Sequence, residues 1–187
     1  MDTLVYLKNM LRDKQVASFT PTSAFAIERI CSRIDFGQRN VIVEYGPGTG
    51  VFTHYLLGHL THDSVLILIE RNEDFVHILR ETFHDPRLFV FHESAENVAQ
   101  VLADCHEEQA DYIVSGIPFS FLPHELRATI VASSHECLKP GGRFLAYQTF
   151  FQMDRFLRDY LDRRFRAVET EIYLFNAPPL KVFEAVK

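Results

Sequence analysis

The sequence predicts an α/β protein built on one Rossmann-like, seven-stranded sheet. The sheet is expected to be mostly parallel, with helices on both faces and an antiparallel hairpin at its C-terminal end. Short apolar runs alternate with stretches whose apolar residues recur at helical spacing, which is the pattern of βαβ units. Only residues 176–179 separate the last two runs, which is too short a connection for a crossover helix. Those two strands must therefore pair antiparallel.

Seven apolar runs, each bounded by polar or turn-forming residues, are the predicted strands. They lie at 41–44, 65–69, 88–91, 112–115, 143–149, 168–175 and 180–186. Helices are predicted after the start signal Thr20-Pro21-Thr22-Ser23, after each of the first four strands, and at 152–163. Pro123 opens the helix before the fifth strand, and Lys139-Pro140-Gly141-Gly142 is expected to end it.

Length and charge limit the class of protein. The 187 residues fit one domain, predicted at 20–187, after an N-terminal segment at 1–19. A net charge of −6 argues against a dedicated nucleic-acid binder. The three cysteines lack metal-ligand spacing, so we expect reduced thiols and no metal site. No apolar run approaches the length that spans a bilayer, and a cytoplasmic location is expected.

The most specific motif is Glu44-Tyr45-Gly46-Pro47-Gly48-Thr49-Gly50, which includes the end of the first strand. A dinucleotide-binding fingerprint needs a third glycine three residues after the second, and Val51 stands there. The Glu-x-Gly-x-Gly-x-Gly spacing is instead similar to that of enzymes that bind S-adenosylmethionine (SAM). Glycines at 46, 48 and 50 let the chain turn sharply and let a ligand approach the backbone. Glu44 is expected to face a charged or hydroxyl-rich part of that ligand.

The other cofactor-binding residues are predicted at the ends of later strands, because ligands of open α/β sheets bind beyond the carboxyl ends of the strands. Glu70 is expected to accept hydrogen bonds from the ribose diol. The adenine is expected near Ser94, which is also suited to cap a helix, and the two roles are compatible. Arg71, Ala95, Glu96 and Ser115 complete the predicted set. Which residue reads the adenine amino group stays open.

The loop Gly116-Ile117-Pro118-Phe119, after the fourth strand, is predicted to bind the methyl acceptor. Gly116 permits close approach and Pro118 stiffens the loop. Phe119 is expected to pack on an alkyl group of the substrate or to hold a cation over its ring. The alternative is that Phe119 belongs to the core below a simple turn.

Over residues 20–187 the sequence resembles the class I SAM-dependent methyltransferases. The resemblance rests on the glycine loop, on Glu70 and on Leu138-Lys139-Pro140-Gly141-Gly142. Within the class, the segments 19–23, 44–53 and 114–118 are most similar to bacterial phospholipid N-methyltransferases. This resemblance implies SAM as cofactor and the ethanolamine headgroup of phospholipids as acceptor. It also implies peripheral attachment to the inner membrane through residues 4–15, where Leu4, Leu7 and Leu11 form an apolar stripe beside basic residues.

Three alternatives remain. Ribosomal RNA adenine dimethylases share the core, and Ile117-Pro118-Phe119 fits their Asn-Ile/Leu-Pro-Tyr/Phe loop, but Gly116 stands where they have Asn. These RNA enzymes also carry a C-terminal helical domain and a basic face, neither of which is expected here. The other two alternatives are a methyltransferase of a soluble small amine and a non-catalytic SAM-binding module. The acceptor, the number of methyl transfers and the oligomeric state stay open.

Methyl transfer to nitrogen needs a neutral amine aligned with the methyl carbon, so orientation supplies much of the rate. The resemblance implies that an ammonium group must first lose a proton. Tyr6, His124 and Tyr147 are the candidate proton acceptors or orienting groups. A purely structural role is the alternative for each.

Overall fold

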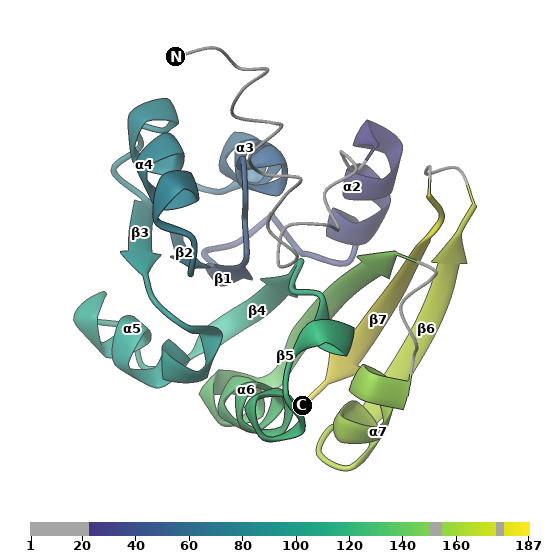
Figure 1. Ribbon diagram of the computed structural model, residues 1–187. Helices are drawn as coiled ribbons and strands as arrows, with labels where there is room; N and C mark the ends of the chain where they lie inside the picture. The colour runs from purple at the N-terminus through teal and green to yellow at the C-terminus, as the bar shows by residue number, and fades with distance from the viewer. Residues whose placement is uncertain (1–22, 150–154, 175–177) are drawn as a thin grey trace.

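The computed structural model describes residues 23–149, 155–174 and 178–187. Its seven strands form one sheet in the order β3-β2-β1-β4-β5-β7-β6 (Figure 1). The strands are β1 (Val41–Tyr45), β2 (Val65–Glu70), β3 (Leu88–His92), β4 (Ala110–Ser115), β5 (Leu138–Thr149), β6 (Ala167–Tyr173) and β7 (Leu180–Val186). Strands β1 to β5 pair in parallel, whereas β7 is antiparallel to both β5 and β6. The predicted sheet, including its C-terminal hairpin, is confirmed.

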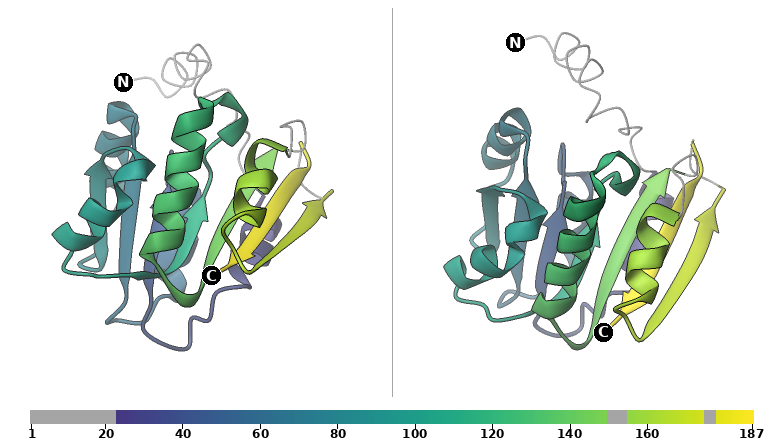
Figure 2. Two further views of the ribbon diagram at one scale, coloured as in Figure 1. Left: turned by 90° about the horizontal axis from the view of Figure 1, so that it is seen from below. Right: turned by 60° about the horizontal axis from the view of Figure 1, so that its bottom comes forward.

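Helices cover both faces of the sheet, as predicted (Figure 2). They are α2 (Ala24–Cys31), α3 (Val51–His59), α4 (Glu73–Thr82), α5 (Val98–Asp104), α6 (His124–Cys137) and α7 (Arg155–Asp162). Two short 3-10 turns, η1 (Ala95–Asn97) and η2 (Phe119–Phe121), precede α5 and α6. Alternation along β1 explains the two layers: Val41 and Val43 pack in the cluster with α5, α6 and α7, while Ile42 packs with α2, α3 and α4.

The main departure from the sequence prediction is at the start of β5. The strand begins at Leu138, directly after α6, so the segment Lys139-Pro140-Gly141-Gly142 is part of the strand and not a separate stop. Gly141 has a φ of +79°, and the pairing with β4 shifts register between Ala110 and Tyr112. A glycine tolerates this local irregularity, which the helix-stop interpretation did not anticipate.

Several predicted features lie partly or wholly outside the described residues. They include the N-terminal amphipathic segment at 4–15, the first residues of the start signal at 20–23 and of the helix predicted at 152–163, the end of the strand predicted at 168–175, and part of the connection at 176–179. The domain boundary at residue 20 therefore stays a prediction. Ser23, the last residue of the predicted start signal, does cap α2, because its hydroxyl accepts from the Ala26 backbone N–H at 3.2 Å.

Candidate active site

The loop between β1 and α3 is held in a conformation that favours glycine at three positions. Gly46, Gly48 and Gly50 have φ angles of +63°, +57° and +83°. The Gly46 N–H donates to the Ile69 carbonyl at 2.9 Å, which fixes the loop against the end of β2. The loop therefore needs glycine at these three positions because of its backbone conformation, as the sequence argument expected.

Gly50 is required for a second reason, which is packing. A Cβ at position 50 would lie 2.4 Å from Cε2 and 2.8 Å from Cζ of Phe83, which follows α4. Leu79 of α4 closes the same space at 3.0 Å. The third glycine therefore lets α3 and α4 approach each other, and its missing side chain faces the protein.

Glu70 joins the glycine loop to the end of β2. Its Oε2 accepts from the Gly48 N–H at 3.2 Å, and its Oε1 accepts from the Asn72 N–H at 2.9 Å. Only 8% of the residue is exposed, and burial raises the pKa of its carboxyl against the effect of these backbone hydrogen bonds. The carboxylate is thus held rigidly at the position where the sequence predicts ribose binding.

A cavity of about 650 Å³ opens beyond the carboxyl ends of the strands, and its lining residues divide into two chemically different walls. One wall is polar and carries Gly46, Glu70, Arg71, Asn72, Ser94 and Ala95. The other wall is largely apolar and carries Gly116, Ile117, Pro118, Phe121, Leu122 and Leu126. The predicted cofactor and acceptor regions therefore share one cavity.

Glu44 lies behind the glycine loop and is not among the residues that line this cavity. The side chain is buried, and its Oε2 accepts from the Thr53 hydroxyl at 2.7 Å. Its Oε1 is buried and has no hydrogen-bond partner among the described residues. Burial, reinforced by the charge of Glu70, raises the pKa of Glu44 to about 8. An orphaned carboxylate oxygen of this kind suits a nearby positive charge.

Ser94 occupies the N-cap position of η1, but its hydroxyl makes no capping hydrogen bond, which leaves it available on the cavity wall. Glu93 Oε2 instead accepts from the Ser94 N–H at 3.2 Å and from Asn97 Nδ2 at 2.8 Å. Glu96 does not line the cavity. Ser115 is fully buried, and its Oγ accepts from the Ile117 N–H at 3.4 Å within the acceptor loop.

The acceptor loop presents a different aromatic residue from the one expected. Phe119 is fully buried and packs edge-on against Phe144 with ring centroids 6.4 Å apart. This is the core position that the alternative interpretation described. Phe121 is 61% exposed and lines the cavity. The aromatic side chain at the acceptor wall is therefore Phe121, because the 3-10 turn η2 points Phe119 inward.

The three candidate proton acceptors have different surroundings. Tyr6 lies outside the described residues. His124 begins α6 and packs edge-on against Tyr160 with ring centroids 5.5 Å apart, and it is not among the residues that line the cavity. Tyr147 stacks on Phe52, the second residue of α3, with ring centroids 4.4 Å apart. Of the two described candidates, the structure brings only Tyr147 to the glycine loop.

Asn72 was missed in the sequence. Its Oδ1 caps α4 by accepting from the N–H groups of Asp74 and Phe75, and the residue lines the cavity beside Glu70. An Asn followed by Glu73 and Asp74 is a recognisable helix start, so the signal was present. Thr53, which binds Glu44, had no comparable signal, because a Thr inside a helix is compatible with many roles.

Residues 42–142 match the model of a family described as a methyltransferase domain. The chain belongs to this family of methyltransferase domains. It is 31% identical over 145 residues to an ornithine lipid N-methyltransferase from Singulisphaera acidiphila, covering 73% of this chain and 76% of that protein. The chain is thus a SAM-dependent methyltransferase, and SAM is its cofactor.

Solved structures of the methyltransferase fold superpose over most of the chain. A precorrin-6Y C5,15-methyltransferase from Geobacter metallireducens GS-15 gives a TM-score of 0.71 at 14% identity, covering 94% of this chain and 95% of its own. The N-methyltransferase NodS from Bradyrhizobium japonicum WM9 gives a TM-score of 0.70 at 15% identity, covering 87% of this chain and 93% of the NodS chain. At these identities the likeness shows the fold alone.

The residues present fit SAM on observations of the structure itself. The glycine loop places Gly46 on the cavity wall, Glu70 presents a carboxylate on the same wall, and Glu44 leaves an unmatched oxygen behind the loop. In the described part of the chain, no group of three or more His, Cys, Asp or Glu residues is arranged to hold a metal. None of the described helices is long and apolar enough to cross a membrane.

Proposed function

We propose that this methyltransferase acts on the primary amine of a lipid headgroup at a membrane surface. The observation that carries the proposal is the apolar acceptor wall of the cavity, where the lining residues from 116 to 130 include no acidic or basic side chain. Phe121 stands largely exposed on this wall. A wall of this kind suits the alkyl part of an amphipathic substrate better than a soluble, fully hydrated amine.

Two lipid headgroups are considered. The sequence resemblance implies phosphatidylethanolamine, and a relative with 31% identity is named an ornithine lipid N-methyltransferase. Both lipids present a primary aliphatic amine to the same chemistry. We propose phosphatidylethanolamine as the acceptor, with ornithine lipid as the second candidate that the relative favours.

When bound, SAM supplies an electrophilic methyl group attached to a sulfonium. The chain's own residues hold and orient the reactants. Glu70 accepts hydrogen bonds from the ribose hydroxyls, and Gly46 places the backbone of the glycine loop at the cavity beside it. Ile117, Pro118 and Phe121 pack on the alkyl part of the acceptor and exclude water around the amine. Alignment of the neutral amine is the main contribution that this arrangement makes to the rate.

The test is a methylation assay with labelled SAM and liposomes. Separate liposomes contain phosphatidylglycerol alone, phosphatidylglycerol with phosphatidylethanolamine, or phosphatidylglycerol with ornithine lipid, and free ethanolamine is a soluble control. We expect label in the organic phase only when an amine lipid is present. If the protein binds S-adenosylhomocysteine normally but labels no lipid, the proposal fails. Label on ethanolamine alone would favour a soluble-amine enzyme, and no label on any acceptor, RNA included, would favour a binding module.

Membrane attachment through residues 4–15 is a separate part of the proposal. Deleting residues 1–15 is expected to abolish co-sedimentation with anionic liposomes and most lipid methylation, because the apolar stripe and its basic flank are lost. Binding of S-adenosylhomocysteine should persist. If the truncated protein methylates liposomes at the full rate, membrane attachment does not depend on this segment.

A further inference from the structure

The space beside Gly116 is already filled by a tyrosine hydroxyl. A Cβ at position 116 would lie 2.5 Å from the Oη of Tyr147, 2.9 Å from its Cζ and 3.3 Å from the carbonyl oxygen of Gly46. The Gly116 N–H also donates to the Tyr45 carbonyl at 3.0 Å, so the backbone cannot shift away easily. The phenol hydroxyl of Tyr147 therefore stands where a side chain at position 116 would begin, between the β1 and β4 loops.

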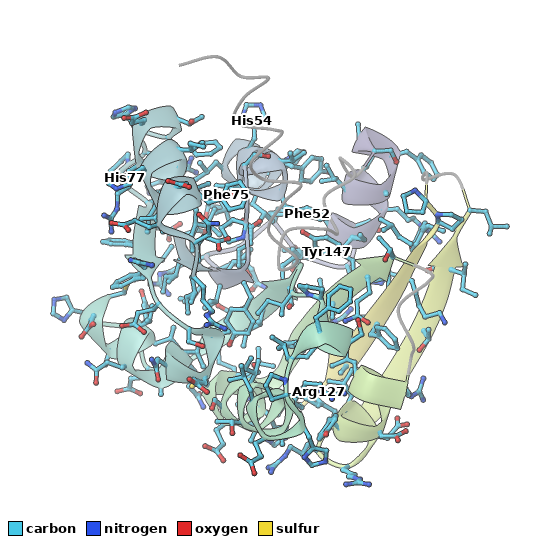
Figure 3. All side chains as sticks on the ribbon, in the orientation of Figure 1. Phe52, His54, Phe75, His77, Arg127 and Tyr147 are labelled. Carbon is cyan, nitrogen blue, oxygen red and sulfur yellow. The ribbon has the colours of Figure 1, made fainter. Side chains whose placement is uncertain are left out.

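Tyr147 is fixed in this place by the element that follows the glycine loop. Its ring stacks on Phe52 at an interplanar angle of 16°, and Phe52 is itself only 2% exposed (Figure 3). On β5, the neighbouring Ala146 is in register with Ser115 of β4. The glycine loop, the acceptor loop after β4 and Tyr147 are thus packed together as one unit.

The hydroxyl has unused hydrogen-bonding capacity. Among the described residues, none forms a hydrogen bond with Tyr147 Oη. Burial, followed by the charges of Glu44, Cys31 and Glu70, raises the pKa of Tyr147 well above its usual range. The phenol therefore stays protonated at neutral pH, and it can donate or accept a hydrogen bond but does not serve as a base.

We propose that Gly116 and Tyr147 form a pair that determines acceptor specificity, in which the Tyr147 hydroxyl replaces a side chain at position 116 as the group that orients the acceptor amine. A carboxamide at this position would offer a donor and an acceptor in one plane, which suits the planar amino edge of a base such as adenine. A hydroxyl is a single rotating group, which suits a tetrahedral aliphatic amine. The identity of that amine as a lipid headgroup rests on the function proposed above.

The first variant is Tyr147→Phe, which keeps the ring on Phe52 and removes only the hydroxyl. We expect kcat/KM for the amine acceptor to fall about tenfold or more, as for loss of one oriented hydrogen bond, while affinity for S-adenosylhomocysteine changes little. The shape of the pH profile should stay the same, because a protonated phenol contributes no titration there. Unchanged kcat/KM, or loss of one limb of the pH profile, overturns the proposal.

The second test is a double-mutant cycle. Gly116→Ala should impair both stability and activity, since its Cβ overlaps the hydroxyl. Adding Tyr147→Phe removes the closest atom and should restore part of the loss in the free energy of unfolding, a readout that needs no acceptor. Gly58→Ala is the matched control, because a Cβ there meets nothing within 4 Å. Strictly additive effects of Gly116→Ala and Tyr147→Phe would contradict the assigned contact.

The activity assays are run on lipid amines and on soluble primary amines in parallel. If only soluble amines are methylated and Tyr147→Phe lowers that activity, the pair stands and the lipid proposal fails. If lipid amines are methylated equally well by the wild type and by Tyr147→Phe, the lipid proposal stands and the pair fails. A wild type that methylates no amine overturns both.

Discussion

The two walls of the cavity are built by different means. On the cofactor wall, carboxylates and backbone N–H groups hold each other: Glu70 binds the N–H groups of Gly48 and Asn72, and Asn72 caps α4. On the acceptor wall, the lining side chains are apolar or aromatic, and the side-chain hydrogen bonds to the Ile117 backbone are long. Gln148 Nε2, for example, donates to the Ile117 carbonyl at 3.4 Å.

The difference follows from what each ligand requires. A nucleoside cofactor has fixed polar groups, so its wall is a rigid network of hydrogen bonds whose parts depend on one another. A flexible amphipathic acceptor is better served by shape and by exposed apolar surface. Substitutions of polar side chains on the cofactor wall should therefore change stability and cofactor affinity together, and those of exposed apolar side chains on the acceptor wall should change acceptor use alone.

The largest expected effect is that of Gly50→Ala. The new Cβ would overlap the Phe83 ring at a backbone φ of +83°, so the free energy of unfolding should fall by about 2–4 kcal/mol. Gly58→Ala, inside α3 and facing open space, should instead stabilise the protein by up to about 1 kcal/mol. Urea unfolding measures both. Equal changes in the two variants would show that the glycine loop is not packed as described.

Glu70→Gln comes next. Replacing the carboxylate weakens its hydrogen bonds to the loop and to a ribose diol, so affinity for S-adenosylhomocysteine should fall about 10- to 100-fold in calorimetry. The matched control is Glu73→Gln, at the same cavity but with a side chain 74% exposed, where we expect a change below about twofold. If Glu70→Gln has only a small effect on the affinity for S-adenosylhomocysteine, Glu70 is not the central cofactor-binding residue of the polar wall.

Glu44 provides a test through pH. Burial raises the pKa of Glu44 from 4.5 to about 8, so the folded state binds this proton more tightly than the unfolded state. Its contribution to stability is complete below the unfolded pKa and is lost as pH rises through the folded pKa. Between about pH 5 and 8, wild-type stability should therefore decline relative to that of Glu44→Gln by roughly 1–3 kcal/mol.

Urea titrations at several pH values measure this difference for both proteins. The free energy of unfolding of Glu44→Gln should still fall somewhat with rising pH, because the pKa of Glu70 is also raised. Parallel stability curves for the two proteins would mean that Glu44 is ionised in the fold at neutral pH.

The smallest expected effect is on the acceptor wall. Phe121→Ser removes an aromatic ring that is 61% exposed, so the free energy of unfolding should change by less than about 0.5 kcal/mol. Affinity for S-adenosylhomocysteine should stay the same, while the apparent KM for the amine lipid in liposomes rises about threefold or more from loss of apolar contact. A drop in cofactor affinity in this variant would show that the two walls are not independent.

Sequence reasoning was most successful where backbone geometry leaves few choices. One structural interpretation was clearly the simplest for each of three features: the glycines at 46, 48 and 50, the buried strand β1, and the short connection at 176–179. The predicted sheet was confirmed. The start of β5 was mispredicted because Pro140 and Gly141 signal a helix end equally well whether a loop or an irregular strand follows.

Site details were harder to predict because they depend on which way a side chain points. Phe119 and Phe121 are two residues apart in a 3-10 turn, and nothing in their local sequence tells which ring is buried. The contact of Tyr147 with Gly116 joins neighbouring strands through a register that periodicity does not give. The assignments of Glu44 and Glu70 to parts of the cofactor stay predictions until the variants above are measured, and that of Ser94 stays a prediction.

The position of β7 between β5 and β6 dictates when this fold can close during synthesis. Among the described strands, β6 pairs only with β7, and Glu184 of β7 receives hydrogen bonds from both Arg33 and Arg143. While the ribosome still encloses residues 180–187, β5 presents an open edge and β6 has nothing to pair with. A nascent chain stalled at this stage exposes an unpaired strand edge, the type of surface that promotes aggregation and engages chaperones.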